Sequence, residues 1–305
     1  MTYQVEIQFH PIDELMNSLH TMICKKSYKK IDLGLAWAEE TESQLTSRLS
    51  SCIKETELNN DWKTICLLIH LCPFKESVED VLHWIERLTI GDIYEILSEY
   101  VKIFPSNMRD YRNKIIYLLS EWNLQYFSRC SPIMIDALHK HAEDKRNELA
   151  QNLTSISEFV NTTTNGFHFV PVDGLEKLVL VPQYHFQPAN ITYFYGKLTL
   201  CQYASRISFG DEKDISPYMY RTIRSLGEKS RLKILQSLHG ERKTFTEIVK
   251  DAGISKGIVH DHIFNLRCAG LIHAYIEGEN VTDYSLRLEG IHYMNNQLLN
   301  YLQPQ

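Results

Sequence analysis

The sequence has no apolar run long enough to cross a membrane. The longest, Ile65 to Leu71, is interrupted by His70, whereas a transmembrane helix needs about 20 consecutive apolar residues. The N-terminal residues also have no basic stretch followed by an apolar one, which is the pattern of a signal peptide. We therefore expect a cytoplasmic protein that makes no membrane contact.

Paired cysteines are missing as well. The seven cysteines are scattered, their number is odd, and none forms a CxxC motif. We therefore expect neither a disulfide framework nor a zinc ribbon. Cys66, His70 and Cys72 are close together, but they lie in an almost wholly apolar segment, where core packing is a simpler interpretation than a metal cluster. No metal site and no cofactor are predicted.

Sequence motifs of the common enzyme classes are also absent. No GxSxG, HExxH, P-loop or GxGxxG sequence stands in a fitting context. No catalytic residue is predicted, and we do not expect an enzyme. A strong positive charge, typical of many nucleic-acid-binding proteins, is missing too, because the formal net charge is −6. Residues 217–305 are the less acidic part, with 11 Lys and Arg against 9 Asp and Glu.

The length of 305 residues suggests two domains of about 150 residues each. Residues 3–10 alternate with the period of a strand, and a helical period then continues to about residue 160. Runs of β type fill residues 166–205. We predict an α+β, mostly helical fold with an N-terminal helical domain, residues 1–210. Its β segment forms a small antiparallel sheet, which the N-terminal strand is a candidate to join. An effector-binding or dimerisation role is the hypothesis for this domain.

The β segment is rich in aromatic side chains, and two interpretations of them stay open. They line a pocket for an unidentified small-molecule effector, or they only cover the sheet. The residues are Phe167, Phe169, Tyr184, Phe186, Tyr193, Phe194 and Tyr195.

Residues 216–305 follow a linker at residues 210–216 and show a sharper pattern of helix signals. Ser216-Pro217 starts a helix, and Thr244-Phe-Thr-Glu247 is a capping box. Gly253 suits a tight turn, and Ser255 caps a helix that runs to about Ala269, followed by a hairpin at residues 271–286. This order is typical of a winged helix-turn-helix, whose second helix enters the DNA major groove. The inward positions predicted for that helix are Ile258, Val259, Ile263 and Leu266.

Three stretches, Leu226–Leu235, Thr246–Val249 and Gly253–Ile263, resemble the ArsR-like winged-helix transcriptional regulators. Arg231 matches the arginine that precedes the family's ILxxL helix, and His262 matches the histidine in the middle of its recognition helix. The N-terminal region resembles that of some longer ArsR-like regulators, where its role is unknown. This second resemblance implies architecture only.

The resemblance implies a transcriptional regulator, in the simplest case a repressor, that binds double-stranded DNA as a homodimer. Metal-sensing members carry a cysteine motif on the helix before the recognition helix. That helix, residues 244–250, has no cysteine here, so metal sensing at this position is not predicted. The C-terminal stripe either packs on the first helix of the domain or pairs with its twin, and the resemblance favours the dimer. Its residues are Ile291, Met294, Leu298 and Leu302.

Candidate DNA contacts lie at the starts of two helices and along the recognition helix. Helix N-termini, hydroxyl groups and basic side chains favour phosphate. The predicted contacts are Lys243, Thr244, Thr246, Ser255, Lys256, Gly257, His260, His262 and Arg267. Asp261, on the same helix, would repel phosphate unless it accepts a hydrogen bond from a cytosine amino group. Asp261 and the acidic wing tip, Gly278–Asn280, support the alternative of a protein-interaction module whose winged helix no longer binds DNA.

Overall fold

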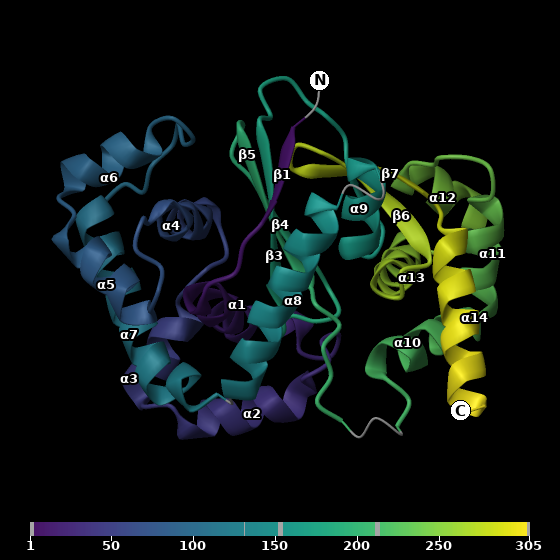
Figure 1. Ribbon diagram of the computed structural model, residues 1–305, viewed down its shortest axis with the longest axis horizontal. Coiled ribbons are helices and arrows are strands. Elements are labelled where there is room, and N and C mark those ends of the chain that lie inside the picture. Colours follow the sequence, from purple (N-terminus) through teal and green to yellow (C-terminus); the bar gives the residue numbers. More distant parts are fainter. Residues whose placement is uncertain (1–2, 131, 152–154, 211–213, 304–305) are drawn as a thin grey trace. The chain divides into compact units, whose positions relative to one another are not determined.

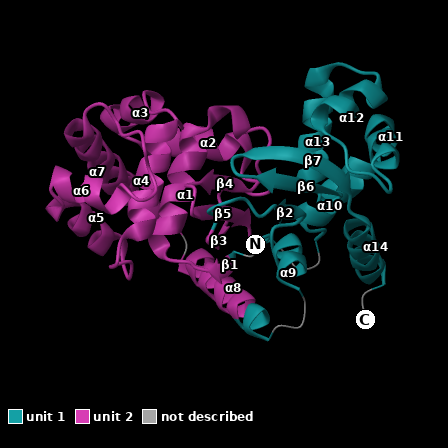
Figure 2. Cartoon of the chain, turned by 90° about the horizontal axis from the view of Figure 1, so that it is seen from above, with its two compact units in different colours: residues 1–3, 147–175, 206–305 teal, residues 4–146, 176–205 magenta. Residues whose placement is uncertain are grey.

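The computed structural model describes residues 3–130, 132–151, 155–210 and 214–303, and Figure 1 shows the order of its elements. The chain folds into two compact units, each built from separate segments. Unit 1 comprises residues 1–3, 147–175 and 206–305, and unit 2 comprises residues 4–146 and 176–205 (Figure 2). The two units are described one at a time.

This division differs from the predicted boundary between residues 210 and 216. Residues 147–175 belong with the C-terminal segment because β2 (Phe167–Phe169) pairs in parallel with β6 (Ile272–Glu277). A three-residue strand carries no sign of its partner in its own sequence, since pairing depends on contacts about 100 residues away. Of the predicted linker, residues 211–213 lie outside the described residues.

Unit 2 is mostly helical. Five of its helices begin where a side chain caps the first turn. For example, Ser77 Oγ accepts a hydrogen bond from the Asp80 amide, and Asn59 Oδ1 accepts one from the Trp62 amide. Trp62 and Trp122 are among the largest fully buried side chains of its core. The helices are α1 (Pro11–Ile23), α2 (Gly34–Gln44), α3 (Ser47–Lys54), α4 (Asn60–Leu71), α5 (Val78–Arg87), α6 (Ile90–Leu97), α7 (Met108–Gln125) and α8 (Pro132–Ala150), with 3-10 turns η1 (Lys25–Ser27) and η2 (Phe127–Arg129). Residues 147–150, the last turn of α8, are assigned to unit 1.

The sheet of unit 2 is mixed, in the order β1-β3-β5-β4. The strands are β1 (Gln4–Ile7), β3 (Lys177–Gln183), β4 (Ile191–Phe194) and β5 (Leu198–Ala204). The α+β, mostly helical class is confirmed, and the N-terminal strand does join the sheet. The expected antiparallel direction is wrong for β1, β3 and β5, which run parallel; only the β4–β5 pair is antiparallel. The run Leu178–Val181 is buried throughout, as is typical of strands covered on both faces in parallel sheets.

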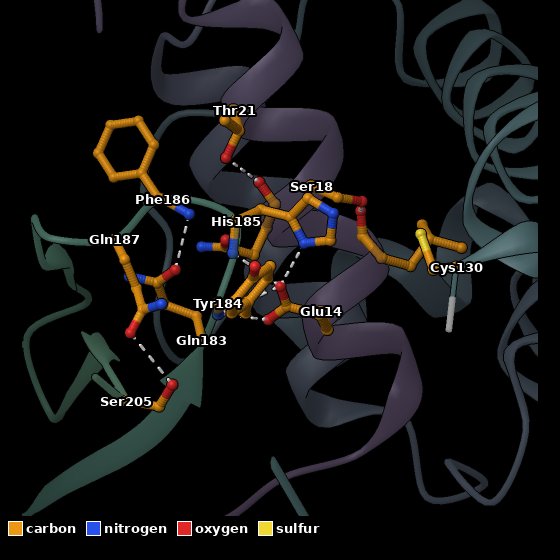
Figure 3. A network of polar contacts seen from close by, with 12 residues as sticks. Glu14, Ser18, Thr21, Cys130, Gln183, Tyr184, His185, Phe186, Gln187 and Ser205 are labelled. Atoms are coloured by element: carbon orange, nitrogen blue, oxygen red, sulfur yellow. Dashed lines mark hydrogen bonds and ion pairs between the residues drawn. The ribbon is translucent and has the colours of Figure 1, made fainter. Parts of the chain in front are cut away.

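A buried polar network lies where the end of β3 meets α1 (Figure 3). The Glu14 carboxylate, fully buried, accepts hydrogen bonds from the backbone amides of Tyr184 and His185. It also lies 2.5 Å from Nδ1 of the His185 ring. The opposite ring nitrogen, Nε2, is 2.8 Å from the hydroxyl of Tyr126. This network joins the first helix of unit 2 to the loop after its central strand.

Unit 1 contains the predicted winged helix-turn-helix. Its sheet has the order β2-β6-β7, and an isolated bridge joins Lys243 to Tyr284 of β7. The elements besides β2 and β6 are α9 (Ile156–Thr163), α10 (Pro217–Leu226), α11 (Lys229–Ser237), α12 (Phe245–Ala252), α13 (Lys256–Cys268), β7 (Asn280–Leu286) and α14 (Leu288–Leu302). Helix, short helix, tight turn, helix and hairpin therefore follow in the predicted order.

The upstream segment α9–β2 is held in unit 1 by a buried arginine and a close backbone approach. The Arg287 guanidinium donates to the side-chain oxygen of Asn161 at 3.2 Å and to the carbonyl of Gly270 at 2.9 Å. Gly166 has a φ of +115°, and a Cβ there would lie 2.6 Å from the Ile272 carbonyl oxygen. This contact requires glycine, so the segment and the wing are packed as one structure.

Candidate nucleic-acid interface

The predicted capping signals fix the starts of both helices of the helix-turn-helix. Thr244 Oγ1 accepts a hydrogen bond from the Glu247 amide, and the Glu247 carboxylate accepts one from the Thr244 amide at 2.8 Å. Gly253 ends α12 with a φ of +63°, and Ser255 Oγ then accepts a bond from the Ile258 amide. The hydroxyls of Thr244 and Ser255 therefore already serve as helix caps.

Helix α13 buries one stripe and exposes the opposite side. Val259, Ile263 and Leu266 are buried, as predicted, at the i, i+4, i+7 spacing of a single helix face. Ile258 was predicted to point inward, and this is wrong because its side chain is 49 % exposed. Successive residues of a helix are about 100° apart, which turns Ile258 out of the stripe that begins at Val259.

Four of the predicted contacts gather at the exposed start of α13, namely Ser255, Lys256, Gly257 and His260. Thr244 and Thr246 are exposed at the start of α12. A Cβ added to Gly257 would meet nothing within 4 Å, so no side chain stands between the helix backbone and a ligand there.

Of the three remaining predicted contacts, two already have partners within unit 1. The Nζ atom of Lys243 lies 2.7 Å from a carboxylate oxygen of Asp251. The guanidinium of Arg267 lies over the ring of Phe167, 5.5 Å from its centre. His262 is half-buried, and burial and the nearby Arg231 lower its pKa. A neutral His262 is therefore favoured at pH 7, so this ring is less suited to a charge contact with phosphate.

The outer face of the wing sheet carries a stacked group that sequence reasoning missed. The His168 ring stacks on Tyr275, with centroids 5.0 Å apart, and the Arg242 guanidinium lies 3.8 Å from the Tyr275 centroid. His168 Nε2 is also 3.1 Å from Nδ1 of His273. Strand alternation places His273 and Tyr275 on one face, but the pairing of β2 with β6, which brings in His168, had no signal in the sequence.

The aromatic residues predicted to line a pocket do not line a cavity that the structure has in unit 2. That cavity, of about 410 Å³, is formed by the loop after α4 and one side of α5. It is lined by Pro73, Phe74, Glu76, Asp80, His83, Trp84 and Arg87. Phe186, Tyr193 and Tyr195 are buried in unit 2, and Phe167 and Phe169 belong to unit 1. An effector pocket lined by these aromatic residues stays a prediction.

Neither metal ligands nor a membrane segment is found in the part of the chain that the structure describes. Its His, Cys, Asp and Glu side chains form no group of three or more placed to hold a metal ion. Among the described helices, none has the length and apolar character needed to span a bilayer. Cys66 and Cys72 are buried free thiols, and burial raises the pKa of Cys66 to about 12.

The helix-turn-helix segment matches a known protein family. Residues 228–274 match the family model described as "Bacterial regulatory protein, arsR family". This ArsR-type segment, as we call it, is similar to the helix-turn-helix of that family. It spans α11, α12, α13 and the start of β6, and its helices carry six of the nine predicted contacts, the other three being Lys243 and the caps Thr244 and Ser255.

Solved structures and curated proteins add little to the family match. A possible transcriptional regulatory protein (fragment 1–100) from Mycobacterium bovis matches with a TM-score of 0.23 and 18 % identity, over 28 % of this chain and 92 % of that one. No curated protein matches the chain. The ArsR-type segment thus rests on the family match and on its own geometry.

Proposed function

We propose that the protein is a DNA-binding transcriptional regulator that uses α13 of the ArsR-type segment as its recognition helix. The observation that carries the proposal is the exposed first turn of α13, in a segment that matches a family of regulators. A helix exposed in this way fits the major groove with its N-terminal residues toward the bases.

The proposed contacts divide by chemistry. Lys256 and the amides at the start of α13 bind phosphate, because a helix N-terminus attracts anions. Gly257 lets the helix backbone approach the DNA, and His260 reaches a base edge or a phosphate. Thr246 and Thr244 anchor the backbone at the start of α12. Lys243 and Arg267 contribute only if they leave Asp251 and Phe167.

The proposed regulator is a homodimer formed through α10 and α14. These helices pack together, with the rings of Tyr218 and Tyr293 6.0 Å apart. Of the predicted stripe, Ile291, Met294 and Leu298 are half-buried and Leu302 is 64 % exposed. Five more large side chains are exposed on this pair: Tyr220, Leu288, Tyr293, Leu299 and Tyr301. A second copy would cover this face and set two half-sites about 34–36 Å apart on the DNA. The proposed regulator is a repressor, because a dimer bound at a promoter would block access of RNA polymerase to the DNA.

The test is fluorescence anisotropy with a duplex from upstream of the protein's own gene and a scrambled duplex, each at two salt concentrations. The specific duplex should bind about 10³-fold more tightly or better, and its affinity should fall as salt rises. Lys256→Ala should weaken both complexes and lower the salt slope by about 1. Lys102→Ala, an exposed lysine of unit 2, is the matched control. Absence of salt-dependent binding to any duplex would contradict the proposal.

A protein-interaction module is the second candidate. The exposed Asp261 and the exposed Glu277 and Glu279 of the wing favour it, because carboxylates repel phosphate. A specific protein partner captured by the full chain, together with no DNA complex at low salt, would support this candidate over the first.

A further inference from the structure

The exposed face of α13 carries a large apolar side chain on its first turn. Ile258, Asp261 and Asn265 lie at i, i+3 and i+7 and therefore share one face of the helix. The Asn265 side chain donates to the carbonyl of Asp261 at 2.7 Å, which turns it back along the helix. Ile258, 49 % exposed, is thus the large apolar group that this face presents, one residue after the open position at Gly257.

A single exposed apolar side chain is ordinary on a protein surface. A functional role for Ile258 therefore has to be argued from where the residue lies on the helix. Ile258 lies on the first turn of the helix proposed to enter the major groove, beside the buried stripe Val259, Ile263 and Leu266 and about 100° from Val259 around the helix. The carboxylate of Asp261 on the same face disfavours contact with phosphate. This face is therefore suited to base edges rather than to the DNA backbone.

We propose that Ile258 is a specificity-determining residue that reads a thymine through the C5-methyl group. In the major groove the thymine methyl is the apolar group that separates thymine from cytosine, and apolar side chains recognise it by contact. Gly257 supports this contact because no side chain at that position holds the helix away from the groove. The inference rests on the proposed function, since it requires α13 in the groove.

The experiment uses the full chain and a duplex that this protein selects from a randomised library. Each thymine of the selected duplex is replaced in turn by deoxyuridine, which removes the methyl group and keeps the base pair. At one position per half-site, this replacement should weaken binding about fourfold, the factor expected from burying one methyl-sized group. With Ile258→Ala, deoxyuridine at the same position should cause no further loss. Because Ile258 packs little inside the protein, the variant is expected to fold normally.

The control is Leu232→Ala, which removes another half-exposed apolar side chain, on α11. This variant should keep the full loss at the sensitive thymine. If no thymine is sensitive, or if Ile258→Ala keeps the loss, the inference is overturned while the proposed function stands. If no duplex is enriched by the protein, the proposed function fails and the inference fails with it.

Discussion

Two histidine clusters, one buried in unit 2 and one half-buried in unit 1, give the same side chain opposite charge preferences. In unit 2, burial opposes a charged His185, but hydrogen bonds with Cys130 and with the Glu14 carboxylate outweigh it and raise the pKa of His185 to about 9. In unit 1, burial, together with the nearby His168 and Arg287, lowers the pKa of His273 to about 4. The partner of the ring therefore decides whether burial produces a cation or a neutral imidazole.

The two clusters stabilise their units by different interactions. The Glu14–His185 pair is ionic, with Glu14 fully buried and His185 2 % exposed. The His168–His273 pair is a neutral hydrogen bond of 3.1 Å between two rings, in which one ring donates and the other accepts. Unit 2 is thus held at this point by charge, and the contact between β2 and the wing depends on the absence of charge.

The largest expected effect is that of Glu14→Gln. Removing one partner of a buried ion pair leaves the other unpaired, and this typically costs about 3–5 kcal/mol. The tryptophans all lie within residues 4–146, so tryptophan fluorescence during urea unfolding reports on unit 2. Glu6→Gln is the matched control: its ion pair with Lys177 spans 2.8 Å at the surface and should contribute less than about 1 kcal/mol. Equal losses in the two variants would contradict the ionic interpretation.

The two clusters should also give opposite pH dependences. His185 binds its proton more tightly in the folded state, so its contribution to stability is complete below pH 6.5 and is lost as the pH rises through about 9. His273 binds its proton less tightly when folded, so its contribution is complete above pH 6.5 and is lost as the pH falls toward about 4.

Each unit has its own probe for this pH profile. Tryptophan fluorescence follows unit 2, and labelling of Cys268, a buried thiol and the one cysteine within residues 147–175 and 206–305, follows unit 1. Urea unfolding at a series of pH values should show unit 2 weakening on the alkaline side and unit 1 on the acid side. In Glu14→Gln the alkaline loss should become smaller, because Cys130 alone then raises the pKa of His185. An alkaline loss of unchanged size in this variant would assign it to another group.

The elements that the sequence predicts well are those fixed by neighbouring residues. Helix starts such as the capping box at Thr244–Glu247 depend on a few adjacent side chains, and the turn at Gly253 depends on one. The exposed start of α13 could be located for the same reason. The buried stripe was also correct at Val259, although its neighbour Ile258 was not.

The features that the sequence hides are those made by distant partners. Glu14 and His185 are 171 positions apart, and no local pattern marks either of them as half of a pair. The parallel pairing of β1 with β3, and of β2 with β6, depends on the same kind of distant contact. The predicted boundary of the C-terminal domain left out residues 147–175 for this reason, because a strand from the middle of the chain completes the sheet of unit 1.

The smallest effect, and the one that tests the neutral half of the comparison, is that of His168→Asn. This change removes the bond between His168 and His273 without adding a charge, so unit 1 should lose about 1 kcal/mol at pH 7. It also leaves the His273 ring without a second imidazole beside it, which should raise the pKa of His273 toward its ordinary value and reduce the acid-side loss. Labelling of Cys268 in urea at pH 5 and pH 7 measures both effects. If His168→Asn instead makes unit 1 more sensitive to acid, the two rings share a proton at pH 7. The contrast between the two clusters is then smaller than the pKa values of His185 and His273 indicate.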